Sequence, residues 1–301
     1  MQRADSRYHH TRRYSKQLKH VVLLGLILLI AFVPTFYSIH ITHADELQIW
    51  FFDIGQGDAT FIQTPEGKQI LVDGGPDDRV LQKLGSVMWP WDRTLDAIVV
   101  THPDADHITG LVNVLEQYEV REIIETGARG TTPVIRALDE VIEQEQAVHR
   151  IVKMGEVILF DGLTLHVVWP LQTYENEQPD DRNNTSIVLL AEYGQTSVLL
   201  TGDAEVESEV GMQSFLQDVD VLKAGHHGSS SSSTSAFLKQ IQPEVTIISA
   251  GVDNRYGHPH PVVLDRLSQI GSKIFRTDLD GDILLTSSGE EPTIKPSPLP
   301  F

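Results

Sequence analysis

The sequence predicts a layered α/β domain whose functional site lies at the ends of its strands. Three observations support this fold class. Short apolar runs separated by turn residues follow residue 44, and strand-like and helix-like segments alternate along the rest of the chain. Clusters of histidine and aspartate come directly after several of the strand-like runs. The 301 residues are enough for one such domain with a substantial core.

The first strands are predicted to form a meander. Apolar-rich runs at 47–52, 59–63 and 69–72 are separated by the turn-forming sequences GQGD and PEGK. A further buried strand is predicted at 95–100. The apolar spacing over 108–118 then predicts a helix that packs on the sheet.

The second half contains hairpins and strand–helix pairs. Residues 186–203 predict a hairpin that turns at Gly194-Gln195, where a leading glycine suits a type II′ turn. Strands are predicted in 219–225 and 244–251, and each precedes a helical pattern. Residues 273–288 predict a closing hairpin.

Residues 1–44 differ from the rest of the chain. The uncharged stretch 21–38 follows six basic residues and one acidic residue. A positive flank before an apolar stretch near the roughly 20 residues that span a bilayer is typical of a signal peptide or a membrane anchor. We therefore expect a cytoplasmic basic tail and an apolar helix within 1–44, and an extracytoplasmic domain over 45–301. The domain would be membrane-anchored, or secreted if the chain is cleaved after the small residues THA at 42–44.

Cysteine content and charge exclude several function classes. The chain has no cysteine, which excludes disulfides, thiolate metal ligands and a cysteine nucleophile. After residue 44, 17 basic residues stand against 41 acidic ones, a net charge of −24. Such a surface repels long polyanions unless a local patch reverses its sign, although solubility or adaptation to salt explains the charge equally well.

Four candidate metal ligands lie within six positions of the loop that follows the predicted strand 95–100. They are His102, Asp104, Asp106 and His107. Imidazole and carboxylate both bind divalent metals, and four of them could supply two ligands to each of two adjacent ions. A solvated acidic loop would explain Asp-Ala-Asp alone. The flanking histidines and the apolar strand favour a metal site.

Other polar residues beside turns and strand ends have two interpretations. Asp58 and Asp73 are candidates for orienting metal ligands, or for capping turns. His258 and His260, in the GHPHP loop, are candidates for substrate contact, and His258 also for proton donation to a leaving group. Arg255 is the candidate phosphate clamp because a guanidinium can meet phosphate oxygens with two bonds; a surface ion pair is the alternative.

These motifs together resemble one branch of a known family. The sequence HPDADH at 102–107 is similar to the His-x-His-x-Asp-His signature of the metallo-β-lactamase superfamily, with aspartate at the second histidine position. Further stretches resemble, in matching order from residue 47 to about residue 290, the metallo-β-lactamase-like domain of ComEC-type DNA-uptake competence proteins. They are FFDIGQGDATFIQTPEGKQILVDGG, NNTSIVLL, LLTGDAE, VLKAGHHGS, DNRYGHPHP and TDLDGDILLTSSG. Those proteins are polytopic channels, whereas this chain has one apolar segment, so the resemblance implies the domain's fold and chemistry but not DNA uptake.

The resemblance implies a four-layer αβ/βα sandwich with a two-metal site on one edge. His102 and Asp104 would bind the first ion, and Asp106 and His107 the second. Asp203 matches the carboxylate that bridges both ions.

Further site residues follow from the same resemblance. His226 matches a later histidine ligand, with His227 as its close competitor. Asn184 and Ser186 stand in NNTS, where the superfamily usually has another histidine, and are expected to bind substrate. His149 and His166 are the only histidines near that region, and His166 is expected to be structural.

The expected function is hydrolysis by two divalent ions, Mn²⁺ or Zn²⁺, with Asp106, Asp203 and His258 as catalytic residues. A phosphodiester is the expected substrate, with nucleic acid ends or single strands preferred over long duplex. Another hydrolase of the superfamily, acting on a phosphocholine ester, lactone, thioester or β-lactam, is the first alternative. A non-catalytic domain that binds metal or nucleic acid is the second. Beyond the membrane and the substrate, the sequence predicts no protein partner.

Overall fold

The computed structural model describes residues 19–20, 22–25, 45–175 and 177–299. Of the amino-terminal unit Met1–Ala44, residues 19–20 and 22–25 are helical. Most of the predicted apolar segment 21–38 lies outside the described residues. Within the described residues, no helix has the length and apolar character needed to cross a membrane. Asp45–Phe301 forms a compact unit of its own.

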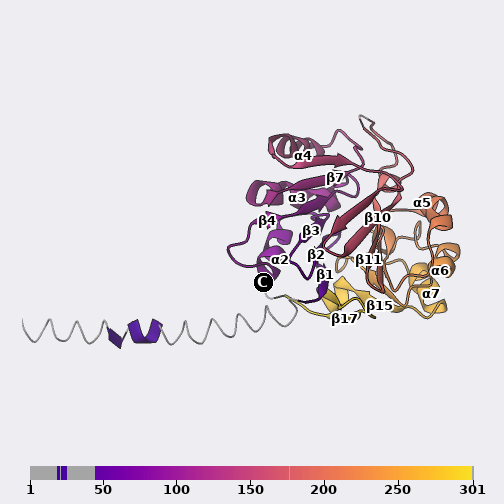
Figure 1. The fold of residues 1–301 in the computed structure, drawn as a ribbon. Coiled ribbons are helices and arrows are strands. Elements are labelled where there is room, and N and C mark those ends of the chain that lie inside the picture. The colour runs from indigo at the N-terminus through magenta and orange to yellow at the C-terminus, as the bar shows by residue number, and fades with distance from the viewer. Residues whose placement is uncertain (1–18, 21, 26–44, 176, 300–301) are drawn as a thin grey trace, which may run out of the picture. The chain divides into compact units, whose positions relative to one another are not determined.

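Two large mixed sheets form this unit (Figure 1). In the first sheet the strand order is β17-β16-β1-β2-β3-β5-β7-β8. Its strands are β1 Leu47–Phe51, β2 Thr60–Gln63, β3 Gln69–Val72, β5 Ala97–Val99, β7 Glu122–Glu125, β8 Val148–Ile151, β16 Ile283–Ser287 and β17 Thr293–Pro296. In the second the order is β15-β14-β13-β12-β11-β10-β9. Its strands are β9 Val157–Phe160, β10 Leu163–Trp169, β11 Val188–Tyr193, β12 Thr196–Leu200, β13 Val221–Lys223, β14 Val245–Ile248 and β15 Lys273–Arg276. A separate short pair joins β4 Thr94–Leu95 to β6 Glu119–Val120.

Helices cover the outer face of each sheet, which gives four layers. The first sheet packs against α2 Arg79–Val87, α3 Ala105–Gln117 and α4 Pro133–Gln144. The second packs against α5 Val206–Met212, α6 Ser235–Ile241 and α7 Pro261–Gln269. The largest core cluster joins the two sheets to each other. The predicted αβ/βα sandwich is confirmed.

Alternation along β1 shows how the sequence builds these layers. Ile49 and Phe51 point into the core between the sheets, whereas Trp50 and Phe52 point toward the helices. Successive residues of a strand face opposite sides of the sheet. All four side chains are buried because both faces of this sheet are covered. An apolar run without polar alternation therefore belongs to a strand that is covered on both faces.

The parallel strands place their carboxyl ends where the polar loops occur. In the first sheet β3, β5, β7 and β8 run parallel to one another, and in the second β12 to β15 do so. Such strand ends are the usual location of ligand sites in α/β folds.

Two predicted connections have opposite outcomes. The hairpin of β11 and β12 is confirmed: Tyr193 pairs with Thr196, and Gly194 has a φ of 61°. The closing hairpin over 273–288 is wrong, because β15 belongs to the second sheet and β16 pairs with β1 in the first. The short helix α8 Thr277–Asp280 lies between them, so the chain changes sheets here and does not fold back on itself.

The buried carboxylate of Glu125 ties β7 to β8. It accepts hydrogen bonds from His149 Nε2 at 2.7 Å and Arg129 Nη2 at 2.6 Å. The hydrogen bond to Glu125 raises the pKa of His149 above its ordinary value of 6.5, and burial opposes this only in part. His149 is thus part of a structural ion-pair network.

We expect His149→Gln to destabilise the domain in a pH-dependent way. Because the pKa of His149 is raised by folding, its contribution is complete below pH 6.5 and disappears as the pH rises through the raised value. The deficit in unfolding midpoint should be largest near about pH 5.5 and should shrink toward about pH 9. Thermal unfolding of both proteins across this range measures it, with His166→Gln as a control at the exposed pair with Glu192. A deficit that does not change with pH would contradict the expectation.

Candidate metal centre

The start of the loop between β5 and α3 is fixed by hydrogen bonds from Thr101 to Asp73. Asp73, just after β3, accepts hydrogen bonds from Thr101 N at 2.9 Å and Thr101 Oγ1 at 2.7 Å. Helix α3 begins at Ala105, earlier than predicted, so Asp106 lies in its first turn, as does His107. The helix can approach the β3 loop closely because residue 110 is glycine; a Cβ there would lie 1.9 Å from the Gly74 carbonyl oxygen.

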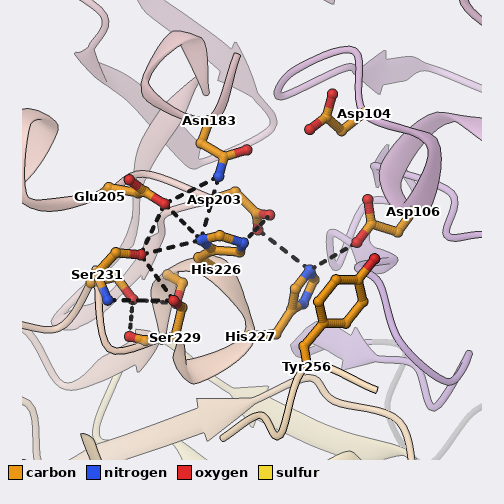
Figure 2. Close-up of polar contacts among 12 residues, drawn as sticks. Asp104, Asp106, Asn183, Asp203, Glu205, His226, His227, Ser229, Ser231 and Tyr256 are labelled. Carbon is orange, nitrogen blue, oxygen red and sulfur yellow. Dashed lines mark hydrogen bonds and ion pairs between the residues drawn. The ribbon is translucent and has the colours of Figure 1, made fainter. Parts of the chain in front are cut away.

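Two consecutive histidines follow β13 in an uncommon backbone conformation. His226 and His227 have φ values of 48° and 55°, both in the left-handed region. For a residue other than glycine this costs roughly 1–3 kcal/mol, and such strain is concentrated at functional sites. The short turn Gly225–Gly228 brings both imidazoles to the edge where Asp203 lies (Figure 2).

Asp203, in the loop after β12, occupies the centre of the site. Its Oδ1 lies 3.2 Å from His107 Nε2 and 3.5 Å from His227 Nε2. Its Oδ2 lies 3.8 Å from His102 Nε2 and 3.8 Å from His226 Nε2. Each carboxylate oxygen therefore faces a different pair of histidines.

Asp106 and Asp104 complete the two halves of the site. Asp106 Oδ2 is 3.4 Å from His227 Nε2, on the side that Asp203 Oδ1 faces. Asp104 Oδ2 is 4.0 Å from His102 Nε2, and its other oxygen accepts a hydrogen bond from Arg182 Nε at 2.5 Å.

The donor set fits a divalent cation. Four buried atoms that face the site have no hydrogen-bond partner: His102 Nε2, His107 Nε2, His227 Nε2 and Asp203 Oδ1. One ligand atom each from Asp106, His107, Asp203 and His227 lies within 4.8 Å of the others. Atoms bound about 2.1 Å from one ion are about 3.0–3.4 Å apart, close to the separations observed here. Buried imidazole nitrogens without partners are costly unless a ligand meets them.

A second ring of contacts orients each imidazole through its Nδ1. Asp73 Oδ2 contacts His107 at 2.7 Å, and Glu205 Oε1 contacts His226 at 2.9 Å. The hydroxyls of Thr101 and Ser186 contact His102 at 3.1 and 3.3 Å. Such contacts fix the ring and leave Nε2 free for a metal.

The Nδ1 side of His227 lies next to a buried ion pair between Asp58 and Lys223. The His227 Nδ1 donates a hydrogen bond to the Ser249 carbonyl oxygen at 3.1 Å and lies 3.2 Å from Asp58 Oδ1. Asp58 Oδ2 in turn accepts a 2.6 Å hydrogen bond from Lys223 Nζ. Asp58, Lys223 and His227 are all buried. The predicted positions of Asp58 and Asp73 beside metal-ligand candidates agree with these contacts.

Histidine and aspartate side chains of opposite charge face one another in the site and shift each other's pKa. Burial alone would lower the pKa of His227, but the carboxylates of Asp203 and Asp58 raise it to about 10. Burial would raise the pKa of Asp106, but its contacts with His227 and the charge of His107 lower it to about 2. A cation that binds His227 must displace the proton of this imidazole, so its binding is linked to pH.

The predicted substrate residues occupy different positions. Asn184 is turned away, since its Oδ1 accepts hydrogen bonds from Glu205 N and Ser208 Oγ at the start of α5. His260 accepts a hydrogen bond from Val262 N and caps α7. Arg255 is exposed, and its guanidinium lies 4.8 Å from the centroid of the neighbouring Tyr256 ring.

His258 and Ser186 do reach the centre. The His258 ring lies 5.5 Å from the His226 ring, and its buried Nδ1 has no partner. Ser186 Oγ accepts a hydrogen bond from Asp203 N, so Ser186 supports Asp203 as well as His102.

Several site residues were missed by sequence reasoning. Asn183 and Glu205 contact His226 (Figure 2), and Arg182 contacts Asp104. Lys223 stands inside an apolar strand, where a lysine is unusual, and this was the available signal. The other three lie at the starts of short helical segments between strands, and the fold determines that these segments are near the site.

The comparisons with known proteins agree with this geometry. The metallo-beta-lactamase superfamily model matches residues 52–252. The chain belongs to the metallo-β-lactamase superfamily. Among solved structures of this fold, the metallo-beta-lactamase fold protein YhfI of Bacillus subtilis aligns with a TM-score of 0.51 at 14% identity, over 80% of this chain and 100% of that one.

Curated relatives of this metallo-β-lactamase chain include proteins named for competence. ComE operon protein 3 of Bacillus subtilis is 33% identical over 259 residues, which cover 80% of this chain and 33% of that protein. Competence protein ComA of Neisseria gonorrhoeae is 29% identical, with 85% of this chain and 34% of that protein covered. The predicted resemblance to the competence-type domain is confirmed. This chain spans about a third of the length of these relatives.

Proposed function

We propose that the domain is a two-metal phosphodiesterase that cleaves nucleic acid. The position of Asp203 is the main support, because its two oxygens face separate histidine pairs. Bound divalent ions would lower the pKa of water and polarise the phosphodiester that it attacks. Membership of a family of metal-dependent hydrolases supports hydrolysis, and relatives named for competence favour nucleic acid as the substrate.

In this proposal each half of the site would hold one ion. His102 and Asp104 would hold the first together with Asp203, and His226 borders this half. Asp106, His107 and His227 would hold the second, also with Asp203. His227 is preferred over His226 as the later histidine ligand, because its Nε2 is buried without a hydrogen-bond partner.

His258 is assigned to substrate contact. Burial and the neighbouring imidazoles of His226 and His227 lower its pKa to about 4, so the ring is neutral at neutral pH. A neutral imidazole is a poor proton donor to a leaving group. It can still contact the substrate at the rim of the site.

The proposed location is outside the cytoplasm, as the basic flank and apolar stretch before residue 45 indicate. The proposed substrates are single strands, ends and short oligonucleotides. Tight duplex binders typically neutralise about six to ten phosphates with lysine and arginine. The 17 basic residues after residue 44 are scattered along an acidic domain, so affinity should be weak and should fall steeply with salt.

Hydrolysis of five substrates tests the proposal. The full chain, reconstituted with metal, should cleave bis-p-nitrophenyl phosphate and labelled single-stranded DNA at low salt. It should leave nitrocefin intact and cut long duplex DNA more slowly than single strands. Turnover of nitrocefin or of a phosphocholine ester, without cleavage of any nucleic acid, would assign the domain to another reaction of the superfamily.

We expect Mn²⁺ to support activity at least as well as Zn²⁺. The proposed ligands include three carboxylates, of Asp104, Asp106 and Asp203, and no thiolate. Oxygen-rich sites suit harder ions. Chelation should remove activity, and titration of the apoprotein with each metal should restore it. Recovery with Zn²⁺ but not with Mn²⁺ would contradict this expectation.

A further inference from the structure

A cavity of about 430 Å³ lies directly beside the metal centre. Asp106 and Ala105, at the start of α3, form part of its wall. Gln56 and Pro76 form another part, and Asn254, Arg255 and Tyr256 complete it. Its volume lies within the roughly 300–1,000 Å³ typical of small-ligand sites. A molecule in this cavity therefore touches a residue that the proposed function assigns to the metal.

Tyr256 presents an aromatic face at this cavity. The residue is 53% exposed, so part of its ring is open to solvent. Its ring lies 5.8 Å from the His258 ring, at an angle of 24° between the planes. Figure 2 shows the Tyr256 hydroxyl pointing toward Asp106, which lines the same cavity.

The loop that carries Tyr256 is fixed by hydrogen bonds. Asn254 Oδ1 accepts the backbone N–H groups of Tyr256 at 3.2 Å and His258 at 3.0 Å. Its Nδ2 donates to the carbonyl oxygens of Gly251 and His258. Gly251 N also donates to Gln56 Oε1 at 3.2 Å, which joins this loop to the opposite wall. The aromatic face is thus presented by an ordered loop.

Arg255 places a positive charge against the same ring. Its guanidinium lies 4.8 Å from the Tyr256 centroid, and Nη2 donates a 2.6 Å hydrogen bond to Tyr256 Oη. This arrangement disfavours a quaternary ammonium, because the cation that an aromatic face attracts would meet the arginine charge. It suits a ligand that has both a flat base and a phosphate.

We propose that Tyr256 is the stacking platform for the nucleobase next to the scissile phosphodiester, and that Arg255 meets an adjoining phosphate. The inference rests on the proposed nuclease activity and specifies its substrate. That substrate is a nucleic acid strand in which the base beside the cleaved bond can unstack from the neighbouring bases. Stacking on an aromatic side chain tolerates any base, because every base has a flat face. Duplex ends and single strands expose such bases, whereas the interior of a duplex does not.

Paired substrates separate base stacking from cleavage. The full chain, loaded with Mn²⁺, is assayed on a short single strand and on the same strand with abasic residues around the cleavage site. Tyr256→Ala should raise the KM for the base-bearing strand about ten-fold more than the KM for the abasic strand. Tyr256→Phe, which keeps the ring, should restore most of that difference.

Two outcomes would overturn the inference. An equal change in KM for both strands would show that Tyr256 acts only on the loop or the backbone. A loss with Tyr256→Ala confined to a phosphocholine ester would show that the ring binds a cation. Absence of cleavage of either strand by the unmodified chain, by contrast, would overturn the proposed function itself.

Discussion

Asp203→Asn should abolish hydrolysis and reduce the metal content of the protein. The variant loses the charge of the carboxylate whose oxygens lie 3.2–3.8 Å from four imidazole nitrogens. The loss of kcat should be at least the about 10²–10³-fold that follows removal of one electrostatic group from an active site. Metal content by elemental analysis and turnover of bis-p-nitrophenyl phosphate measure the two effects.

Asp218→Asn is the matched control for this experiment. Asp218 is an exposed aspartate just before β13, outside the centre, and the same substitution there should leave kcat and metal content unchanged. Circular dichroism and thermal unfolding should show that both variants remain folded. Full activity of Asp203→Asn would remove the two-metal assignment.

Lys223→Met should cost about 3–5 kcal/mol of folding free energy, because it leaves the buried Asp58 carboxylate without its cation. Lys223 Nζ and Asp58 Oδ2 are 2.6 Å apart, and both side chains are almost fully buried. Asp58 also orients His227, so the variant should bind metal about 10–100-fold more weakly. Urea unfolding of the metal-free protein measures the first effect, and metal titration measures the second.

Two comparison variants separate folding from metal binding. Lys83→Met breaks an equally buried pair with Asp282, 2.8 Å away and outside the metal centre. It should destabilise the protein to a similar extent without weakening the metal affinity of the folded state. The double variant Lys223→Met/Asp58→Asn should recover part of the stability, since the buried charge is removed. An unchanged stability of Lys223→Met would show that Asp58 does not depend on this lysine.

The sequence by itself predicted the strands β1, β2, β3 and β5 of the first sheet, and the ligand-rich segment from His102 to His107. These are local features: apolar-rich runs and turn residues define β1 to β3, and four ligand groups in six positions can be recognised without knowledge of the fold. The family followed from several such motifs in matching order. Asp58 and Asp73 were also expected beside metal ligands.

The local sequence pattern did not predict the correct strand pairing where the chain passes from one sheet to the other. Residues 273–288 have the strand–turn–strand pattern of a hairpin, yet β15 pairs with β14 and β16 pairs with β1. Which strands pair depends on the packing of the whole sheet, so the sequence of two strands alone does not show whether they pair with each other. For the same reason, the sequence did not separate Asn184 and His260 from the residues that meet at the centre: each side chain accepts a hydrogen bond from a backbone N–H at the start of a helix.

Only the tertiary structure decided how the site is divided. His226 and His227 are neighbours in sequence, but the left-handed turn sends one Nε2 toward each oxygen of Asp203. Lys223 and Asp58 are 165 positions apart and meet because strand ends from two different sheets converge at one edge. Contacts across that edge depend on the packing of the sheets, so local sequence preferences cannot encode them.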